Sequence, residues 1–275
     1  MKDVLQIDSL TVWRARREVL TDVSFRVRGG EVTVVVGPNG CGKTTLLQAV
    51  TGELPARAGR IHLMGTPLAG WKPSELARCR AALPQTSQLG FDFPAREVVL
   101  MGRTPWQHTA ARQRDRAIVA EVMARLGVDP LADRSYLRLS GGERQRVQLA
   151  RVFAQQWNNL SAAEPCLLLL DEPINQLDLR HQLEVIDLLR WSAAQGAAVV
   201  VVLHDLSWVR RLADRCVVLH DGRVQASDTP QIALRPEVLQ QVFGVSGNWI
   251  PAEPSPLLNA RATTGGKILG ETNAE

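Results

Sequence analysis

Cysteine is scarce in this chain of 275 residues, and no two cysteines form a CxxC pair. The four that are present stand far apart, at Cys41, Cys79, Cys166 and Cys216. We therefore expect neither a structural zinc site nor a disulfide framework, and the usage fits a reducing compartment. The N-terminal residues also lack the apolar region of a secretory signal peptide, so the sequence does not indicate secretion.

Long apolar runs are missing as well. The longest stretch without a charged residue, Val238–Ala252, has 15 residues and is interrupted by Gln, Asn, Ser and Gly. It is too short and too polar for a transmembrane helix, which needs about 20 mostly apolar residues. Apolar residues still make up 45% of the chain and charged residues 22%. This balance is typical of a globular protein and argues against a disordered or fibrous one.

Lysine and tyrosine are rare: the chain has a single Tyr, and Arg accounts for 28 of its 32 basic residues. The formal net charge of +4 has the sign found in proteins that bind nucleic acid or anionic membranes. The basic residues, however, form no block of five or more, and aromatic residues that could stack on bases are few. We interpret the charge as a solvated surface and expect no nucleic-acid partner.

The apolar pattern predicts an α/β fold. Loose alternation over Val4–Arg28 predicts short antiparallel strands at the start. Continuous apolar runs are typical of a parallel sheet that is covered on both faces. Such runs are Val32–Val36, Leu167–Leu170, Ala198–Leu203 and Cys216–His220.

Residues 89–156 differ, because their apolar residues recur at helical spacing. We expect a mostly helical insertion here, with its second helix starting after Ser140. The tail from Pro251 to Glu275 has no apolar period and is expected to be a loosely held extension.

A phosphate-binding loop follows the first buried strand. Gly37–Thr44 fits the pattern GxxxxGK[ST], with a helix-like segment directly after it. The glycines let backbone N–H groups point into one concavity, and the positive end of the helix adds to them, so together they can hold a triphosphate. Lys43 would reach the β- and γ-phosphates, and the Thr44 hydroxyl would ligate Mg²⁺.

A pair of carboxylates ends the second buried strand. Asp171 and Glu172 follow four leucines directly. Asp171 can reach Mg²⁺ through water, and Glu172 beside it is placed to polarise an attacking water molecule. Two solvated carboxylates would be an ordinary finding after a strand, but the phosphate loop in the same chain favours the catalytic interpretation.

A second anion-binding helix end is predicted at Ser140-Gly141-Gly142-Glu143. Ser140 can cap the helix, and the two glycines expose its first N–H groups. Two such ends could meet one triphosphate only if two chains came together head to tail. With these motifs the sequence resembles the ATP-binding subunits of ABC transporters, over roughly residues 3–250.

The resemblance implies a fold and a division of the chain. The fold is a P-loop NTPase with a RecA-like parallel-sheet core, an N-terminal antiparallel β subdomain and an inserted α-helical subdomain. The ABC ATPase domain would cover residues 1–250. Its nucleotide-binding core would be 1–85 and 160–250, and its helical subdomain with the signature motif 86–159. Residues 251–275 would be a C-terminal tail.

Further site residues are implied only by the resemblance. Gln85 would contact Mg²⁺ or the attacking water and sense the membrane partner, and His204 would touch the γ-phosphate and orient Glu172. Asp178, in the D-loop, would lie across the dimer seam, and Trp13 would stack on adenine. The residues expected to contact ATP are then Trp13, Gly37, Pro38, Asn39, Gly40, Cys41, Gly42, Lys43, Thr44, Thr45, Ser140, Gly141, Gly142 and Asp178.

Two residues depart from the family pattern. Ile174 stands where a threonine is usual, and Gln176 where a His or Ala is usual. Neither position is expected to bind phosphate, so the resemblance still implies an active ATPase, while packing at the dimer seam could differ.

Two segments resemble one group within the family, the import ATPases for iron chelates, haem and vitamin B12. They are Phe91–Pro94 with the following Glu97-Val98-Val99, and Gly102–Pro105. Gln155–Pro165 makes the connection between the signature helix and the next strand longer than usual, which resembles the haem branch.

The resemblance implies partners and a location. They are a homodimer of ATPase subunits, integral-membrane permease subunits that dock at residues about 86–107, and indirectly a periplasmic substrate-binding protein. The location is the cytoplasmic face of the bacterial inner membrane.

Other interpretations stay open at this point. The same motor could serve a ferric-siderophore or vitamin B12 importer. A soluble ABC ATPase acting on ribosomes or DNA usually has two motif sets or a long coiled coil, and neither is present. A scaffold that binds ATP without hydrolysing it would not need Glu172 and His204.

Overall fold

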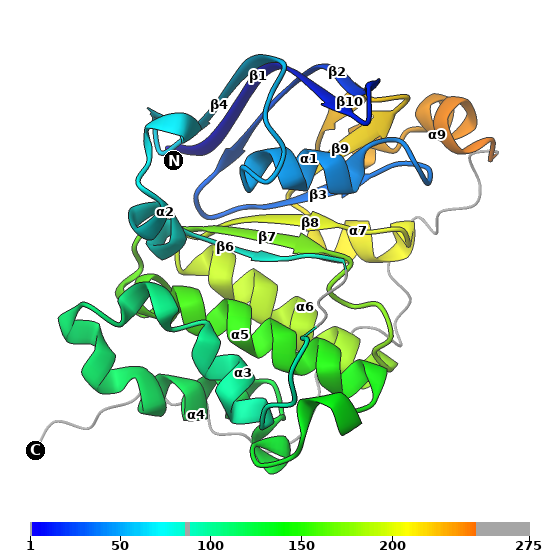
Figure 1. Ribbon diagram of the computed structural model, residues 1–275. Coiled ribbons are helices and arrows are strands. Elements are labelled where there is room, and N and C mark those ends of the chain that lie inside the picture. Colours follow the sequence, from blue (N-terminus) through cyan, green and yellow to red (C-terminus); the bar gives the residue numbers. More distant parts are fainter. Residues whose placement is uncertain (1, 86–88, 246–275) are drawn as a thin grey trace, which may run out of the picture.

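Two β-sheets, with helices between and around them, make up the computed structural model, which describes residues 2–85 and 89–245 (Figure 1). The smaller sheet is antiparallel, in the order β2-β1-β4-β5. The larger sheet has the order β10-β9-β3-β8-β7-β6 and is parallel except for β10. The strands are β1 (Asp3–Arg14), β2 (Arg17–Arg28), β3 (Val32–Val36), β4 (Ala58–Leu63), β5 (Thr66–Pro67), β6 (Arg80–Leu83), β7 (Leu167–Asp171), β8 (Ala198–Val202), β9 (Arg215–His220) and β10 (Arg223–Asp228).

The parallel sheet confirms the predicted α/β fold. All five residues of each of β3, β7 and β8 are buried. Strands covered on both faces need this continuous apolar composition, which is why the sequence marked them so clearly.

The N-terminal strands are antiparallel, as expected, but they are longer than predicted, at 12 residues each. Their register shifts at several points, and Ser9 and Asp22 adopt positive φ angles of 48° and 52°. Such irregularities interrupt the strict two-residue alternation, so the pattern in the sequence looked like several shorter strands.

Helices cover both faces of the parallel sheet (Figure 1). α1 lies in the apolar layer between the two sheets, while α5 and α6 pack in the layer on the opposite face. The α-helices are α1 (Lys43–Val50), α2 (Pro73–Cys79), α3 (Ala95–Met101), α4 (Asp115–Arg125), α5 (Gly141–Ala162), α6 (Leu179–Ala194), α7 (Leu206–Leu212), α8 (Pro230–Ala233) and α9 (Pro236–Phe243). Short 3₁₀ turns span Leu68–Gly70, Thr104–Trp106, Ala110–Arg114, Asp129–Leu131 and Tyr136–Arg138.

The inserted segment is helical, as expected, with α3, α4 and α5 as its main elements. One expectation within it was wrong: most of Gln155–Pro165 is not a connection. α5 continues to Ala162, past the boundary placed at residue 159, because Phe153, Trp157 and Leu160 keep burying one face of the helix. Trp157 stacks on Trp191 of α6, with ring centroids 5.5 Å apart.

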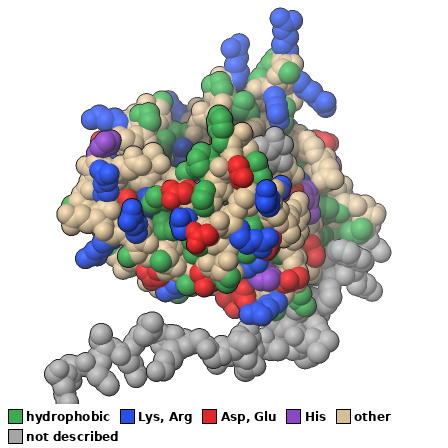
Figure 2. All heavy atoms as spheres, turned by 60° about the horizontal axis from the view of Figure 1, so that its bottom comes forward, with side chains coloured by type: hydrophobic (Ala, Val, Ile, Leu, Met, Phe, Trp, Pro, Cys, Tyr) green, Lys and Arg blue, Asp and Glu red, His purple; other side chains and the backbone are tan. Residues whose placement is uncertain are grey.

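The surface carries charges of both signs. On the face shown in Figure 2, Asp and Glu side chains lie among the Lys and Arg side chains, rather than apart from them. Within the described ranges, the model contains no helix with the length and apolar character needed to cross a membrane. The expected absence of a nucleic-acid partner stays a prediction, and the tail at 251–275 lies outside the described residues.

The helical part contains a buried ion pair. The Arg103 side chain is 1% exposed, and its guanidinium donates to Asp115 (Nε to Oδ1, 2.8 Å) and to the carbonyl of Ala154 (2.6 Å). Burial lowers the pKa of Arg103 from its ordinary value, while the bond to Asp115 acts in the opposite direction. Arg103, two residues after α3, therefore links the first residue of α4 to α5.

Replacing Arg103 by Met should lower the free energy of unfolding by about 3–5 kcal/mol, because Asp115 is then buried without its partner. Urea denaturation measures this change. The matched control is Arg26→Met, since Arg26 pairs with Asp3 on the surface and is 54% exposed. That change should cost less than about 1 kcal/mol. Equal losses in the two variants would contradict the prediction.

Candidate nucleotide-binding site

The phosphate loop joins β3 to α1. Gly42 is the N-cap of α1, has a φ of 109° and has no side chain that could cap the N–H groups of the first turn. Those groups, with the positive end of the helix dipole, form an anion-binding concavity of the predicted kind. The Lys43 ammonium is buried and donates to the carbonyls of Gly37 (2.8 Å) and Pro38 (2.9 Å), which places its charge over the loop.

Thr44 and Asp171 meet beside the loop. The Thr44 hydroxyl donates to Asp171 Oδ2 at 2.8 Å. Asp171 Oδ1 is buried without a hydrogen-bond partner among the described residues. Burial raises the pKa of Asp171, and the bond from Thr44 lowers it to a lesser extent. The free carboxylate oxygen of Asp171 and the hydroxyl oxygen of Thr44 are both hard ligands. Together they suit a cation such as Mg²⁺.

Glu172 follows Asp171 at the end of β7, with its backbone at a φ of 53°. Few non-glycine residues adopt this region, and they cluster at functional sites. Its carboxylate accepts a hydrogen bond from Gln85 Nε2 (3.3 Å) and contacts His204 Nε2 through the same oxygen, Oε1. Asn175 donates to the other oxygen. The structure thus brings together three of the residues predicted to be catalytic and adds Asn175.

Gln145 of α5 is a further residue at this point. Its Nε2 lies 3.3 Å from the carbonyl of Glu172 and 3.2 Å from the carbonyl of Pro173. It thereby ties the helix after the signature motif to the backbone turn that orients Glu172. Nothing in the sequence indicated this role, because 27 residues separate Gln145 from Glu172 and no local pattern connects them.

One polar hollow of about 910 Å³ is lined by nine of the predicted site residues. Residues from the phosphate loop and α1 line it, together with Gln85, Glu172 and His204. Arg14 and Val19, which the sequence analysis did not single out, line it too. Among the described residues, eight predicted ATP contacts do not line it: Trp13, Gly37, Pro38, Cys41, Ser140, Gly141, Gly142 and Asp178.

The signature motif, which contains Ser140-Gly141-Gly142-Glu143, forms a separate helix end. The Ser140 hydroxyl accepts from the backbone N–H of Glu143 (3.3 Å), and Glu143 Oε2 accepts from the N–H of Ser140 (2.7 Å). This capping box confirms that Ser140 caps α5. The bond from Ser140 is the main cause that lowers the pKa of Glu143.

The D-loop, Asn175–Asp178, packs against Gly141 and Gly142 of the signature motif within the chain. A Cβ atom at Gly141 would come within 2.6 Å of Gln176 Oε1, so the Gln176 side chain would have to move, and a Cβ atom at Gly142 would lie 2.9 Å from the Gln176 carbonyl oxygen. Gln176 itself has a φ of 64°. The structure shows where the two residues that depart from the family pattern lie. Gln176 contacts Gly141, and Ile174 is 4% exposed and lies in the core. Asp178 caps α6 by accepting from the N–H of His181 at 2.9 Å.

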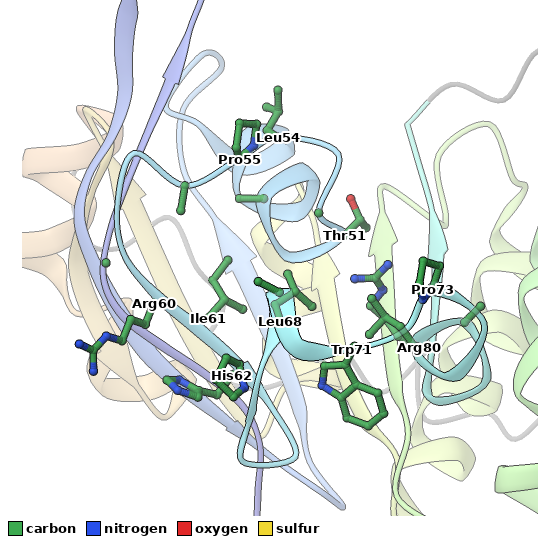
Figure 3. Close-up of a pocket in the computed structure, with 18 residues that line it drawn as sticks. Thr51, Leu54, Pro55, Arg60, Ile61, His62, Leu68, Trp71, Pro73 and Arg80 are labelled. Carbon is green, nitrogen blue, oxygen red and sulfur yellow. The ribbon is translucent and has the colours of Figure 1, made fainter.

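A second hollow of about 870 Å³ lies away from these residues, between the end of α1, β4 and α2 (Figure 3). Its lining is mostly apolar, with Ile61, Leu68 and Trp71 among the labelled side chains. None of the predicted site residues lines it. It therefore belongs to the scaffold around the nucleotide site rather than to the site.

The comparisons with known proteins agree with this geometry. Residues 20–175 match the family model of the ABC transporter. The chain belongs to the ABC transporter family. It is 46% identical to the hemin import ATP-binding protein HmuV of Pseudomonas entomophila, over 92% of this chain and 96% of that protein. It is 48% identical to HmuV of Rhodococcus jostii, over 87% of this chain and 80% of that protein.

Solved structures give the same result. A chain of an inward-facing metal-chelate type ABC transporter is 26% identical, with a TM-score of 0.73, over 89% of this chain and 90% of that one. An ATP-binding subunit of another ABC transporter is 25% identical, with the same TM-score. The predicted resemblance and P-loop NTPase fold are thus confirmed, and as an ABC family member the protein is an ATPase. The role of each site residue stays a prediction.

The phosphate loop depends on one tightly enclosed glycine. Gly37 has a φ of 155°, and a Cβ atom there would lie 2.1 Å from the carbonyl oxygen of Leu219. We expect Gly37→Ala to displace the loop and abolish ATP binding. Gly65→Ala is the matched control, because Gly65 lies outside the phosphate loop, has a φ of 78° and has nothing within 4 Å of an added Cβ. It should cost about 1–2 kcal/mol of backbone strain and keep binding. Titration with a fluorescent ATP analogue distinguishes the two, and equal affinities would refute the argument.

Proposed function

We propose that this chain is the ATP-hydrolysing subunit of a haem importer, docked on the cytoplasmic face of the bacterial inner membrane. The observation that carries the hydrolytic role is the convergence of Gln85 and His204 on one oxygen of Glu172, beside the phosphate loop. The haem assignment is supported by relatives at 43–49% identity that are named as hemin import ATP-binding proteins.

Glu172 is proposed as the general base. It would take a proton from the water molecule that attacks the γ-phosphate. His204 and Gln85 hold the carboxylate in place, and Gln85 would also contact the water molecule or the metal ion. Lys43 and the N–H groups of α1 would balance the charge of the phosphates, with contacts from Gly37, Pro38, Asn39, Gly40, Cys41, Gly42, Thr44 and Thr45.

Mg²⁺ is the metal that the donor set fits. The Thr44 hydroxyl, the free oxygen of Asp171 and the Gln85 carbonyl oxygen are hard ligands, of the kind that Mg²⁺ prefers. When bound, the ion would neutralise charge on the β- and γ-phosphates. Burial raises the pKa of Asp171, which disfavours its charged form. A bound cation would stabilise that charged form.

Two copies of the chain are proposed to complete each site. Ser140, Gly141 and Gly142 expose a helix end that can bind anions but does not line the hollow of their own chain. In a head-to-tail homodimer they would face the γ-phosphate bound by the partner, with Asp178 at the seam. Trp13 is 46% exposed beside the hollow's Arg14, which leaves its ring available to stack on adenine.

Two substitutions separate the roles within this dimer. Lys43→Ala should abolish ATP binding, because Lys43 balances the phosphate charge within its own chain. Ser140→Arg should keep the ATP affinity and stop hydrolysis, because a bulky cation blocks closure of the seam. Equilibrium binding and phosphate release measure the two effects. An equal loss of affinity in both variants would contradict the head-to-tail arrangement.

The substrate must be chosen by partners other than this chain, because its site is built for nucleotide. A permease would dock at about residues 86–107, of which 86–88 lie outside the described residues, and a periplasmic binding protein would act indirectly. Phe91 in this segment is 76% exposed, as a docking side chain would be.

Growth on haem as the sole iron source tests the transport role. A strain lacking this gene should fail to grow, and the intact gene should rescue it, whereas Glu172→Gln should not. Normal growth on haem with a selective defect on a ferric siderophore or vitamin B12 would move the assignment to the sister importers. Normal growth on all three would contradict an import role.

A further inference from the structure

The second half of α5 has a row of amide side chains that the nucleotide site does not use. They are Gln155, Gln156, Asn158 and Asn159, here called the amide cluster. Gln156 and Asn159 are almost fully buried. A buried amide is costly unless it is hydrogen-bonded, so the partners of the cluster indicate what it holds in place.

On one side the amide cluster holds the end of α2. Gln155 Nε2 donates to the carbonyls of Ala77 (2.7 Å) and Arg80 (2.9 Å), and Asn159 Nδ2 donates to the carbonyl of Arg78 (2.6 Å). The last carbonyls of a helix have no partner within the helix, so these amides satisfy them from outside. α2 ends at Cys79 and β6 begins at the next residue, so the same bonds fix the start of β6.

β6 connects this anchor to the hydrolytic site. It is only four residues long, and two residues beyond it Gln85 donates to Glu172. The Arg80 guanidinium also donates to the carbonyl of Val50 (2.7 Å), at the end of α1. Figure 3 shows Arg80 next to Thr51, the residue that follows α1. The start of β6 is therefore bonded to α5 through its backbone and to the phosphate-loop helix through its side chain.

On the other side the amide cluster holds the segment Arg103–Trp106. Trp106 Nε1 donates to the main-chain carbonyl of Gln155 (2.8 Å), and the Arg103 guanidinium donates to Asn158 Oδ1 (2.7 Å). The same guanidinium lies 5.2 Å from the ring centroid of Trp106. This segment is part of the surface that is proposed to receive the permease. Gln155 thus bonds to it with its backbone and to α2 and β6 with its side chain.

We propose that Gln155 is a positioning residue for hydrolysis. Its amide fixes β6 so that Gln85 meets Glu172, and its carbonyl ties that anchor to the permease-facing segment through Trp106. A displacement of the segment Arg103–Trp106 then changes the alignment of Gln85. This inference rests on the proposed function. It adds a role for the end of α5, residues 155–162, of which the sequence analysis noted only the unusual length.

Gln155→Met tests the first half of the proposal, which is that the Gln155 amide fixes β6. Met has a similar length and no hydrogen-bond donor, and the main-chain bond from Trp106 is kept. The isolated subunit should show a kcat lower by about fivefold, the factor that corresponds to one net hydrogen bond. Its KM for ATP should stay unchanged, because the phosphate loop is intact. Gln241→Met is the control, since Gln241 lies exposed on α9, and should leave kcat unchanged.

A double-mutant cycle separates positioning from general destabilisation. If Gln155 acts through Gln85, then Gln155→Met should lower kcat no further in a Gln85→Ala background. Multiplied losses in the double variant, or an unchanged kcat in the single variant, would overturn the proposal. The cycle is needed because proximity alone does not demonstrate coupling.

Trp106→Phe tests the second half and leaves the side chain of Gln155 untouched, so it also serves if Gln155→Met does not fold. The isolated ATPase should be unchanged, whereas stimulation by the permease in the assembled transporter should fall. Full stimulation would overturn the link. A wild-type chain without ATPase activity or permease stimulation would instead refute the proposed function, and this inference with it.

Discussion

The whole site depends on the side-by-side pairing of four parallel strands. β3, β8, β7 and β6 are neighbours in the sheet, so their carboxyl ends lie along one edge. The phosphate loop follows β3, His204 follows β8, Glu172 follows β7 and Gln85 follows β6. Apolar layers on both faces of the sheet hold these strands in the core. The packing of the core therefore also positions the site, since a shift of any one strand would move the group at its end away from the others.

Glu172 is held by residues from several elements. Its left-handed backbone conformation costs about 1–3 kcal/mol in general and persists only where neighbours enforce it. The neighbours are Gln85 after β6, Gln145 on α5, Asn175 in the D-loop and His204 after β8. A carboxylate fixed in this way needs little reorganisation when a water molecule loses its proton, which suits a general base.

α5 connects regions that are far apart. Its 22 residues make it about 33 Å long. Ser140 caps its first turn, Gln145 reaches the turn at Glu172, and the amide cluster lies near its other end. Because a helix is stiff along its axis, a shift at the signature end must be accompanied by a shift at α2 and β6, or by strain between them.

The sequence determined the local features that depend on near neighbours. Val32–Val36 leading into Gly37–Thr44 defined a strand, a phosphate loop and a helix, and the sequence also indicated that Ser140 caps the next helix. The sequence pattern did not predict features that depend on contacts between residues far apart in the chain. α5 continues beyond residue 155 because Trp157 and Leu160 find a buried surface to pack on, and polar amides in the same stretch masked that apolar pattern.

The sequence by itself therefore settled the family, the fold class and the phosphate loop, because a motif of adjacent residues builds each local structure. The tertiary structure alone decided which oxygen of Glu172 meets Gln85 and His204, and that Gln145 supports the turn. It alone showed that Gln155 joins α2 to the segment Arg103–Trp106. These contacts span 27 to 87 residues of sequence, and only the folded core brings such distant groups within hydrogen-bonding distance.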